Sequence, residues 1–440
     1  MGAVRVLKAR MDTRTGQPAG DRQLLTLPVF RQLWGGDFLA RLGYQICEFL
    51  FPLIAVVKLH SSGVEAGLIS ASQFVPVIVF ALIAGAVADQ AETRSLMLVS
   101  SIVRGAMLGL LGLVYGLGGL GFLALLIAAM VVGSATVFYD VGFQSAIPRL
   151  LSSSELARGN GLLQASTSAT QLAGPTLAGL LLSAAGLPFA LGATGAMFAG
   201  AIVAFGFLRS AAMPSARDAG GAQGTGTDRG WRTVFTGLKY SWGCREIRDL
   251  CLQSGFFNLH EQAFVTAFLL FGVRTAHLSA GVVGILLGIA SAGALIGSIV
   301  AGRLSVRLHA GASLTTGLVT ASAMLLIGPL LTPALPVIPV FGTAFLLNGL
   351  ALGTYNVYAI SLRQAIPPRR FVGSATASYR MVSLGLVPVG ALAGGALADA
   401  YGPHAALLII AASMTCVSLL LLSSPVKRIR SVHDAAGAAS

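Results

Sequence analysis

Long apolar stretches alternate with short polar connections along the 440 residues of this chain. Each stretch is close to the roughly 20 residues that a helix needs to cross a bilayer. The alternating segments of about ten residues that mark a membrane β-barrel do not occur. We therefore predict an all-α membrane protein with twelve transmembrane helices. Their expected ranges are 33–57, 64–88, 95–116, 119–141, 158–184, 187–208, 250–273, 281–304, 312–332, 336–360, 371–398 and 403–424.

The two halves of the chain repeat each other at an offset of about 217 residues. Gly67 corresponds in this way to Gly284. Farther along, FYDVGFQSAIP, which ends at Pro148, matches VYAISLRQAIP, which ends at Pro367. Such an internal repeat predicts two pseudo-symmetric six-helix bundles with a binding site at their interface, as in one large class of secondary transporters.

Polar segments divide the chain into five parts. Residues 1–27 contain no apolar core, which predicts a flexible terminus without a signal peptide and a first helix that is retained. Residues 28–208 and 250–424 are the two predicted bundles, and residues 425–440 form a tail. The linker 209–249 begins with a flexible Gly/Ala-rich part and continues as WRTVFTGLKYSWGCREIRDL, which predicts an amphipathic helix on the membrane surface.

The formal net charge of +13 would fit a nucleic-acid partner, but the positions of the charges exclude one. Of the 29 Lys and Arg residues, 24 lie in the termini and in alternate connections. This asymmetry predicts a multi-pass protein of the bacterial cytoplasmic membrane, with both termini in the cytoplasm. The four cysteines are scattered and no P-loop motif occurs, so we predict no metal site and no cofactor. The soluble segments are too short for a catalytic domain, so we do not predict an enzyme.

Four polar side chains interrupt the first apolar stretch and share one helix face. Asp37, Arg41, Tyr44 and Glu48 are spaced by four, three and four residues, which places them within roughly a 60° arc. A charged stripe in a membrane helix faces the protein interior or a water-filled cavity rather than lipid. We predict that this stripe lines a transport path. Arg41 either forms a static bridge with Asp37 or reaches toward Glu48.

The first helix of the second half also carries a carboxylate. Glu261 corresponds by the repeat offset to Tyr44, one turn from Glu48, so the two carboxylates are expected to flank the pseudo-two-fold axis. Burial disfavours the charged form of a carboxylate, which allows it to bind and release a proton near neutral pH. Glu48 is therefore the first candidate for proton coupling, followed by Glu261 and Asp37. His260 lies about 100° away around the helix and is either a second titrating group or a structural histidine with a partner.

Arg104 and Arg380 also lie inside predicted helices, where a charge is costly unless it is paired. Each is expected to pair with a carboxylate or to bind an anionic part of a substrate. Several aromatic rings are available to line an apolar cavity, although most phenylalanines in such a chain face lipid. The candidates for a substrate cavity are Arg41, Tyr44, Arg104, His260, Phe264, Tyr379 and Arg380.

The stretches FRQLWGGDFLARLG, GAVADQAETR, FYDVGFQSAIPRLLSSSELARGNGLLQAS, LAGPTLAGLL and GLVPVGALAGGALADAYG resemble the major facilitator superfamily. The resemblance covers residues 28–424 and is greatest to the drug:proton antiporters that include enterobactin and macrolide exporters. It implies a monomeric transporter that works by alternating access.

The loop between the second and third helices matches the signature of the family only in part. Gly85, Asp89 and Arg94 are present. The resemblance implies that this loop latches the two halves in the outward-open state, with Asp140 on the fourth helix as the expected partner. Alternatively, Asp89 caps the next helix. The positions that depart from the signature are Gln90, Glu92 and Thr93.

The fifth helix carries Gly174, Pro175 and Gly179, which resemble the Gly-Pro antiporter motif that accompanies export. Small residues permit close helix packing and proline bends a helix, so ordinary packing is the alternative interpretation.

Together these features predict an exporter of a hydrophobic or amphipathic small molecule, such as a drug, an antibiotic or a siderophore-like metabolite, by proton antiport. The alternative with the same fold is an uptake permease for an organic solute.

Overall fold

The structure is a computed structural model that describes residues 24, 27–151, 153–208, 239–240, 242–304, 309–367, 372–420, 424, 426 and 429. These residues form helices joined by short connections, and no strand occurs among them. Almost all of the predicted flexible terminus and tail lies outside the described residues. The same holds for most of the linker, including residues 231–238 of the predicted amphipathic helix.

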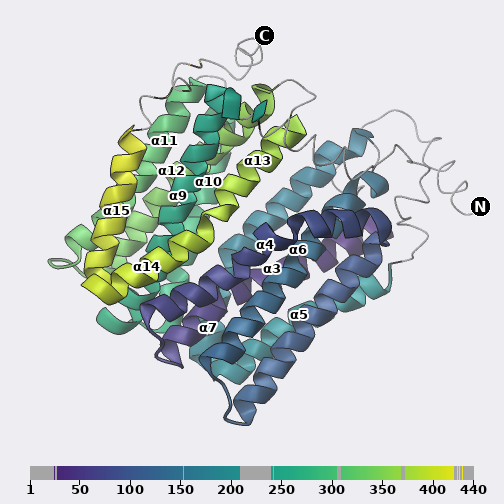
Figure 1. Cartoon of the computed structure of the whole chain (residues 1–440), viewed down its shortest axis with the longest axis horizontal. Helices are drawn as coiled ribbons and strands as arrows, with labels where there is room; N and C mark the ends of the chain where they lie inside the picture. Colours follow the sequence, from purple (N-terminus) through teal and green to yellow (C-terminus); the bar gives the residue numbers. More distant parts are fainter. Residues whose placement is uncertain are drawn as a thin grey trace, which may run out of the picture.

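The helices fall into two bundles, which Figure 1 shows side by side. The helices of the first bundle are α3 (Pro28–Val57), α4 (Gly63–Gln90), α5 (Thr93–Gly116), α6 (Phe122–Leu150) and α7 (Ser153–Gly206). The second bundle contains α9 (Arg245–Leu270), which continues as the π-helix η2 (Phe271–Thr275), then α10 (Ala280–Leu304), α11 (Ala310–Leu331), α12 (Val337–Ala365), α13 (Val372–Gly385), α14 (Val387–Tyr401) and α15 (Pro403–Leu420).

These helices confirm the twelve predicted crossings. The described residues contain 11 stretches that are long and apolar enough to span a membrane. One of them, Arg158–Gly206, belongs to α7, which is two helices joined at Gly186. Gly186 has a φ of 76°, a left-handed conformation that glycine adopts at little cost, and Pro188 follows it at the start of the second helix. In the second half, α13 and α14 together form one crossing.

The backbone itself repeats between the two halves. His60 and His277 are the two non-glycine residues with positive φ in the described part of the chain, at 50° and 51°. They are 217 residues apart, and each follows the first helix of its half. Since positive φ is uncommon for residues other than glycine, its recurrence at this spacing supports the internal repeat found in the sequence.

The two bundles contact each other through α4 with α14 and through α7 with α10. Glycines allow these approaches, because a Cβ at Gly67 would collide with the backbone of Ala391, and one at Gly284 with that of Pro175. The hydroxyl of Thr176 also donates to the carbonyl of Gly284 at 3.4 Å. We call the end that contains connections 58–62 and 402 the distal end, and the end where α3 and α9 begin the proximal end. The contacts named here lie in the distal parts of the four helices.

At the distal end, a carboxylate of the second half caps a helix of the first. Asp399 on α14 accepts the backbone N–H of Gly63 at 2.6 Å and that of Val64 at 2.9 Å. These amides belong to the first turn of α4, where N–H groups lack partners in the helix and the macrodipole favours negative charge. Arg274 of η2 donates to the carbonyl of Ser61 beside them. The distal ends of the two halves are therefore joined by hydrogen bonds as well as by packing.

Replacing Asp399 with Ala should loosen the distal end. Loss of a helix cap costs about 1 kcal/mol, so we expect the distally open population to rise roughly fivefold. The distance distribution between spin labels at Lys58 and Ser279 would report this change. Glu65→Ala is the matched control, because it removes a cap of the same helix, the acceptor for the Ser62 N–H, within the first half alone. Equal distance changes in the two variants would contradict the assigned role.

Candidate functional site

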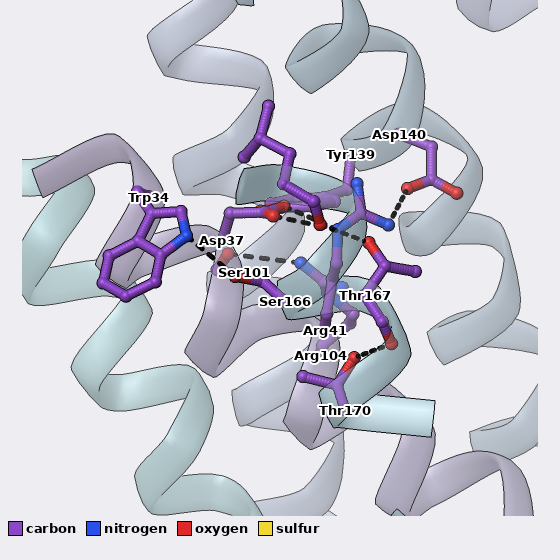
Figure 2. A network of polar contacts seen from close by, with 11 residues as sticks. Trp34, Asp37, Arg41, Ser101, Arg104, Tyr139, Asp140, Ser166, Thr167 and Thr170 are labelled. Carbon is purple, nitrogen blue, oxygen red and sulfur yellow. Dashed lines mark hydrogen bonds and ion pairs between the residues drawn. The ribbon is translucent and has the colours of Figure 1, made fainter. Parts of the chain in front are cut away.

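The polar stripe of α3 forms a buried network with α6, shown in Figure 2. The Nε–H of Arg41 donates to the carboxylate of Asp37 at 2.9 Å, and its Nη1 lies 3.5 Å from Oδ1 of Asp140. The hydroxyl of Tyr139 donates to Oδ1 of Asp37 at 2.9 Å. Asp37 is fully buried, whereas the side chain of Asp140 is 32% exposed. The predicted bridge between Asp37 and Arg41 is therefore confirmed, and Arg41 also reaches a second carboxylate on another helix.

Arg104 of α5 is a fully buried cation in the same bundle. Its guanidinium carbon lies 4.4 Å from the centre of the Tyr139 ring and 4.8 Å from that of Phe198. Its Nε–H donates to the carbonyl of Ser100 and its Nη2 to the hydroxyl of Ser101, whereas its buried Nη1 has no hydrogen-bond partner. Two aromatic faces and two oxygens thus stabilise the charge. No ion pair of Arg104 with a carboxylate is found among the described residues.

Helix α7 closes the network on the side of α3. The indole N–H of Trp34 donates to the hydroxyl of Ser166 at 2.7 Å, and Thr170 donates to the carbonyl of Thr167 at 2.8 Å. Four helices, α3, α5, α6 and α7, therefore contribute to this polar region (Figure 2).

Glu48 and Glu261 differ from Asp37 because they have no cationic partner. Both side chains are half-buried, and no hydrogen bond or ion pair reaches either carboxylate within the described part of the chain. The amide of Gln73 donates to the backbone carbonyl of Glu48. Tyr44 lies between Arg41 and Glu48 along the same face of α3. By helix rise, Glu48 is about 30 Å from the proximal start of α3 and Asp37 about 14 Å.

Two further candidates take part in packing within the second bundle. The ring of His260 bonds through Nδ1 to the carbonyl of Phe256 at 2.7 Å, which gives this histidine a partner on its own helix. Phe264 is buried and meets Phe345 edge to face, with ring centres 6.2 Å apart. The structure therefore places Phe264 inside the aromatic core of the second bundle, and its predicted place in a cavity has no support here.

The predicted residues Tyr379 and Arg380 lie on different sides of α13. Tyr379 is half-buried, and its hydroxyl accepts a hydrogen bond from Ser254 at 2.7 Å. Arg380 is exposed. The guanidinium that contacts Tyr379 is that of Arg363, at 3.7 Å from the ring centre. Sequence reasoning missed Arg363 because it lies near the end of α12 and was counted with the charged connection. Its place in the repeated segment VYAISLRQAIP was the available signal.

The residues of the signature loop have partners within the first half. Arg94 donates to the carbonyls of Phe205 at 3.0 Å and Gly206 at 2.8 Å, at the end of α7. The N-cap position of α5 is occupied by Glu92, whose side chain makes no capping hydrogen bond, and capping of α5 by Asp89 stays a prediction. The side chain of Asp89 lies outside the described residues. A latch formed by Gly85, Asp89, Arg94 and Asp140 stays a prediction, although the ion pair seen for Asp140 is with Arg41.

The Gly-Pro motif of α7 permits two close helix contacts. A Cβ at Gly174 would lie 2.5 Å from the Cβ of Gln45, so this glycine lets α7 approach α3. A Cβ at Gly179 would collide with the backbone of Ala280, so this one lets α7 approach α10 of the other half. Pro175 lies between them, within the helix. The motif therefore brings α7 against both bundles.

Solved structures with this fold are transporters. The chain superposes on the nucleoside transporter NupG with a TM-score of 0.69 and 13% identity, over 89% of this chain and 98% of that one. For a bacterial homologue of the iron transporter ferroportin in an inward-facing state, the TM-score is 0.68 at 17% identity, over 90% and 99%. A bacterial homologue of the lysosomal transporter Spinster, also inward-facing, superposes with a TM-score of 0.67 and 14% identity, over 93% of this chain and 97% of that one. Together with the twelve helices, these matches show that the chain has the same fold as these three proteins.

The sequence profile of the family described as "Transmembrane secretion effector" matches residues 23–438, so the chain belongs to that family. Among its curated relatives is the multidrug efflux pump Tap of Mycobacterium tuberculosis (strain ATCC 25618 / H37Rv). That relative is 26% identical over 415 residues, which cover 91% of this chain and 94% of the relative. The pump Tap of Mycolicibacterium fortuitum is 22% identical over 421 residues, covering 91% and 95%.

Replacing Arg41 with Gln should destabilise the protein, because it leaves the buried carboxylate of Asp37 without a cation. Breaking a buried pair in this way typically costs about 3 kcal/mol. The double variant Asp37→Asn/Arg41→Gln removes both charges and should recover most of that loss. Denaturant titration of the purified protein in mixed micelles measures the free energy of unfolding of the single and the double variant. Arg380→Gln, which changes an exposed side chain, is the control. Additive effects of the two single substitutions would show that the pair is not coupled.

Proposed function

We propose that this transporter exports a hydrophobic or amphipathic small molecule, of the drug, antibiotic or siderophore-like class, in exchange for protons. The similarity over nearly the whole chain to proteins named as multidrug efflux pumps supports the substrate class and the direction. The Gly174-Pro175 motif supports the same direction. The observation that carries proton coupling is the arrangement of three carboxylates along the first helices of the two halves, one paired and two without a cation.

Asp37 and Arg41 provide a proton-sensitive contact between α3 and α6. When Asp37 is charged, Arg41 is shared between it at 2.9 Å and Asp140 at 3.5 Å. Protonation of Asp37 cancels that charge and leaves Asp140 as the remaining anionic partner of Arg41. Arg41 then shifts toward α6, so binding of one proton changes how the two helices are held together.

Glu48 and Glu261 are the proposed coupling carboxylates. Each lies in the membrane part of the first helix of its half and has no cation to hold its charge, so it is readily neutralised by a proton. Tyr44 links Glu48 electrostatically to Arg104, whose guanidinium stacks on Tyr139, the ring that bonds to Asp37. A chain of polar groups therefore runs from the coupling carboxylate to the proximal network.

In the proposed cycle, the two halves rock about the central axis and open the distal and proximal ends in turn. The protein is placed in a bacterial cytoplasmic membrane as a monomer, with both termini in the cytoplasm. The distal end, joined by Asp399, then faces outward and is closed in this conformation. The inward-facing states of two of the structural neighbours support that assignment.

Glu48→Gln should abolish substrate movement driven by a pH gradient, because an amide cannot carry a proton. In proteoliposomes loaded with a fluorescent dye substrate, we expect at least a tenfold loss of gradient-driven transport and of dye-dependent proton flux. Proton transfer by a positioned side chain commonly contributes at least a factor of about ten to a rate. Glu65→Gln, which changes a carboxylate in the first turn of α4 near the distal end, is the control. Full gradient-driven transport by Glu48→Gln would remove Glu48 from the mechanism.

The direction of transport is tested separately in whole cells. Expression of the protein should lower the steady-state accumulation of the dye, and dissipation of the proton gradient should restore it. Higher accumulation on expression would instead identify an uptake permease.

A further inference from the structure

The second half contains a half-buried cation that the proposed proton pathway does not use. Arg363 lies two residues before the end of α12, and its guanidinium stacks on the ring of Tyr379 of α13. Both Nε and Nη1 are shielded from solvent, and neither has a hydrogen-bond partner. No ion pair to Arg363 occurs within the described ranges of the chain. A guanidinium nitrogen is only a donor, so these positions require acceptors.

A second unpartnered group lies close to this cation. Tyr355 lies about two helical turns before Arg363 on α12. It is 2% exposed, and its hydroxyl has no hydrogen-bond partner. It interacts electrostatically with Arg363 and Tyr379, and its ring lies 6.3 Å from that of Phe257 on α9. Leaving a buried donor without an acceptor typically costs about 1–3 kcal/mol, and more for a charged group. Three buried polar atoms in this region, Nε and Nη1 of Arg363 and the hydroxyl oxygen of Tyr355, thus have no hydrogen-bond partner.

The internal repeat shows which carboxylates of the first half have no counterpart between α9, α12 and α13. Asp37 and Arg41 of the first half correspond at the offset of 217 to Ser254 and Asn258, and Asp140 corresponds at 219 to Ala359. Ser254 and Asn258 of α9 instead bond to Ser383 of α13. The hydroxyl of Ser383 lies 2.8 Å from that of Ser254 and accepts from the amide of Asn258 at 2.6 Å. The second half has therefore replaced both carboxylates by neutral groups.

At the same time, the second half has gained a positive charge. Arg363 stands at the position that corresponds to Gln144 in the first half. A cation without a carboxylate, next to an unpartnered hydroxyl, is what a site for an anionic group requires. Arg363 as a whole is half-buried, so the guanidinium is not sealed from its surroundings.

We infer that Arg363 and Tyr355 form a subsite that binds a carboxylate, or an anionic group of like size, on the transported molecule. Tyr379 holds the guanidinium in position from one face, which leaves its edges for oxygen acceptors. The inference rests on the proposed function for the identity of the ligand as a substrate. It adds that amphipathic acids bind more tightly than their neutral analogues.

The test compares a dialkylaminocoumarin carboxylic acid with its primary amide, which has nearly the same shape and no charge. Binding is measured by fluorescence anisotropy with the full chain in nanodiscs of zwitterionic lipid, without a proton gradient. The wild type should prefer the acid. Arg363→Gln should lower the affinity for the acid about tenfold, the effect of losing a charge-assisted hydrogen bond, and change that for the amide less than twofold. Arg303→Gln, which changes an exposed arginine on α10 of the same half, is the matched control.

Two further variants separate binding from folding. Tyr355→Phe removes one hydroxyl from a buried ring and should weaken binding of the acid about threefold, with little effect on the amide. Arg363→Lys keeps the charge but loses the planar donors and the ring contact, so it should fall between the wild type and Arg363→Gln. If the wild type does not distinguish acid from amide, or if Arg363→Gln weakens both equally, the subsite is overturned. Because no gradient is present, this result is independent of whether Glu48 couples transport to protons.

Discussion

A charge inside a membrane protein must be given partners by the protein, and this requirement organises the first bundle. Asp37 is fully buried and is held by Arg41 and the Tyr139 hydroxyl, while Arg104 is held by two aromatic faces and two oxygens. These contacts tie α3, α5, α6 and α7 together around one polar region. The geometry of the bundle and the sensitivity to protons that we propose for it therefore have the same origin, because a group that is costly to bury in charged form responds strongly to the loss of that charge.

The two halves share a backbone plan but differ in their electrostatics. His60 and His277 have the same unusual φ at equivalent positions. In contrast, Asp37 and Arg41 of the first half correspond by the repeat to the neutral Ser254 and Asn258 of the second. Neutral hydrogen bonds can hold helices together as well as ion pairs do, but they do not respond to pH near neutrality. In our proposals the first half binds protons, and the second half, in which Arg363 has no ion pair among the described residues, recognises an anion.

The fold could be predicted from the sequence because span length, charge asymmetry and the repeat all depend on local composition. The contact between Asp37 and Arg41 was also accessible, since residues four apart meet on one helix face. The contact of Arg41 with its second carboxylate, Asp140, depends on how α3 packs against α6. No pattern of neighbouring residues in the sequence predicts that packing. The same limit explains Arg380 and Arg363: the bonds of Tyr379 and Ser383 to α9 determine which side of α13 is buried, and these residues are more than 100 positions apart.

Gly186 joins the two helices of α7 directly, so that they form a helical hairpin with contacts at opposite ends of the molecule. Near the distal end, Gly179 on the first arm presses against α10 of the other half. At the proximal end, the carbonyls of Phe205 and Gly206 on the second arm accept hydrogen bonds from Arg94 in the first turn of α5. One pair of helices therefore has contacts near both faces of the membrane, with the second half at the distal face and with the start of α5 at the proximal face.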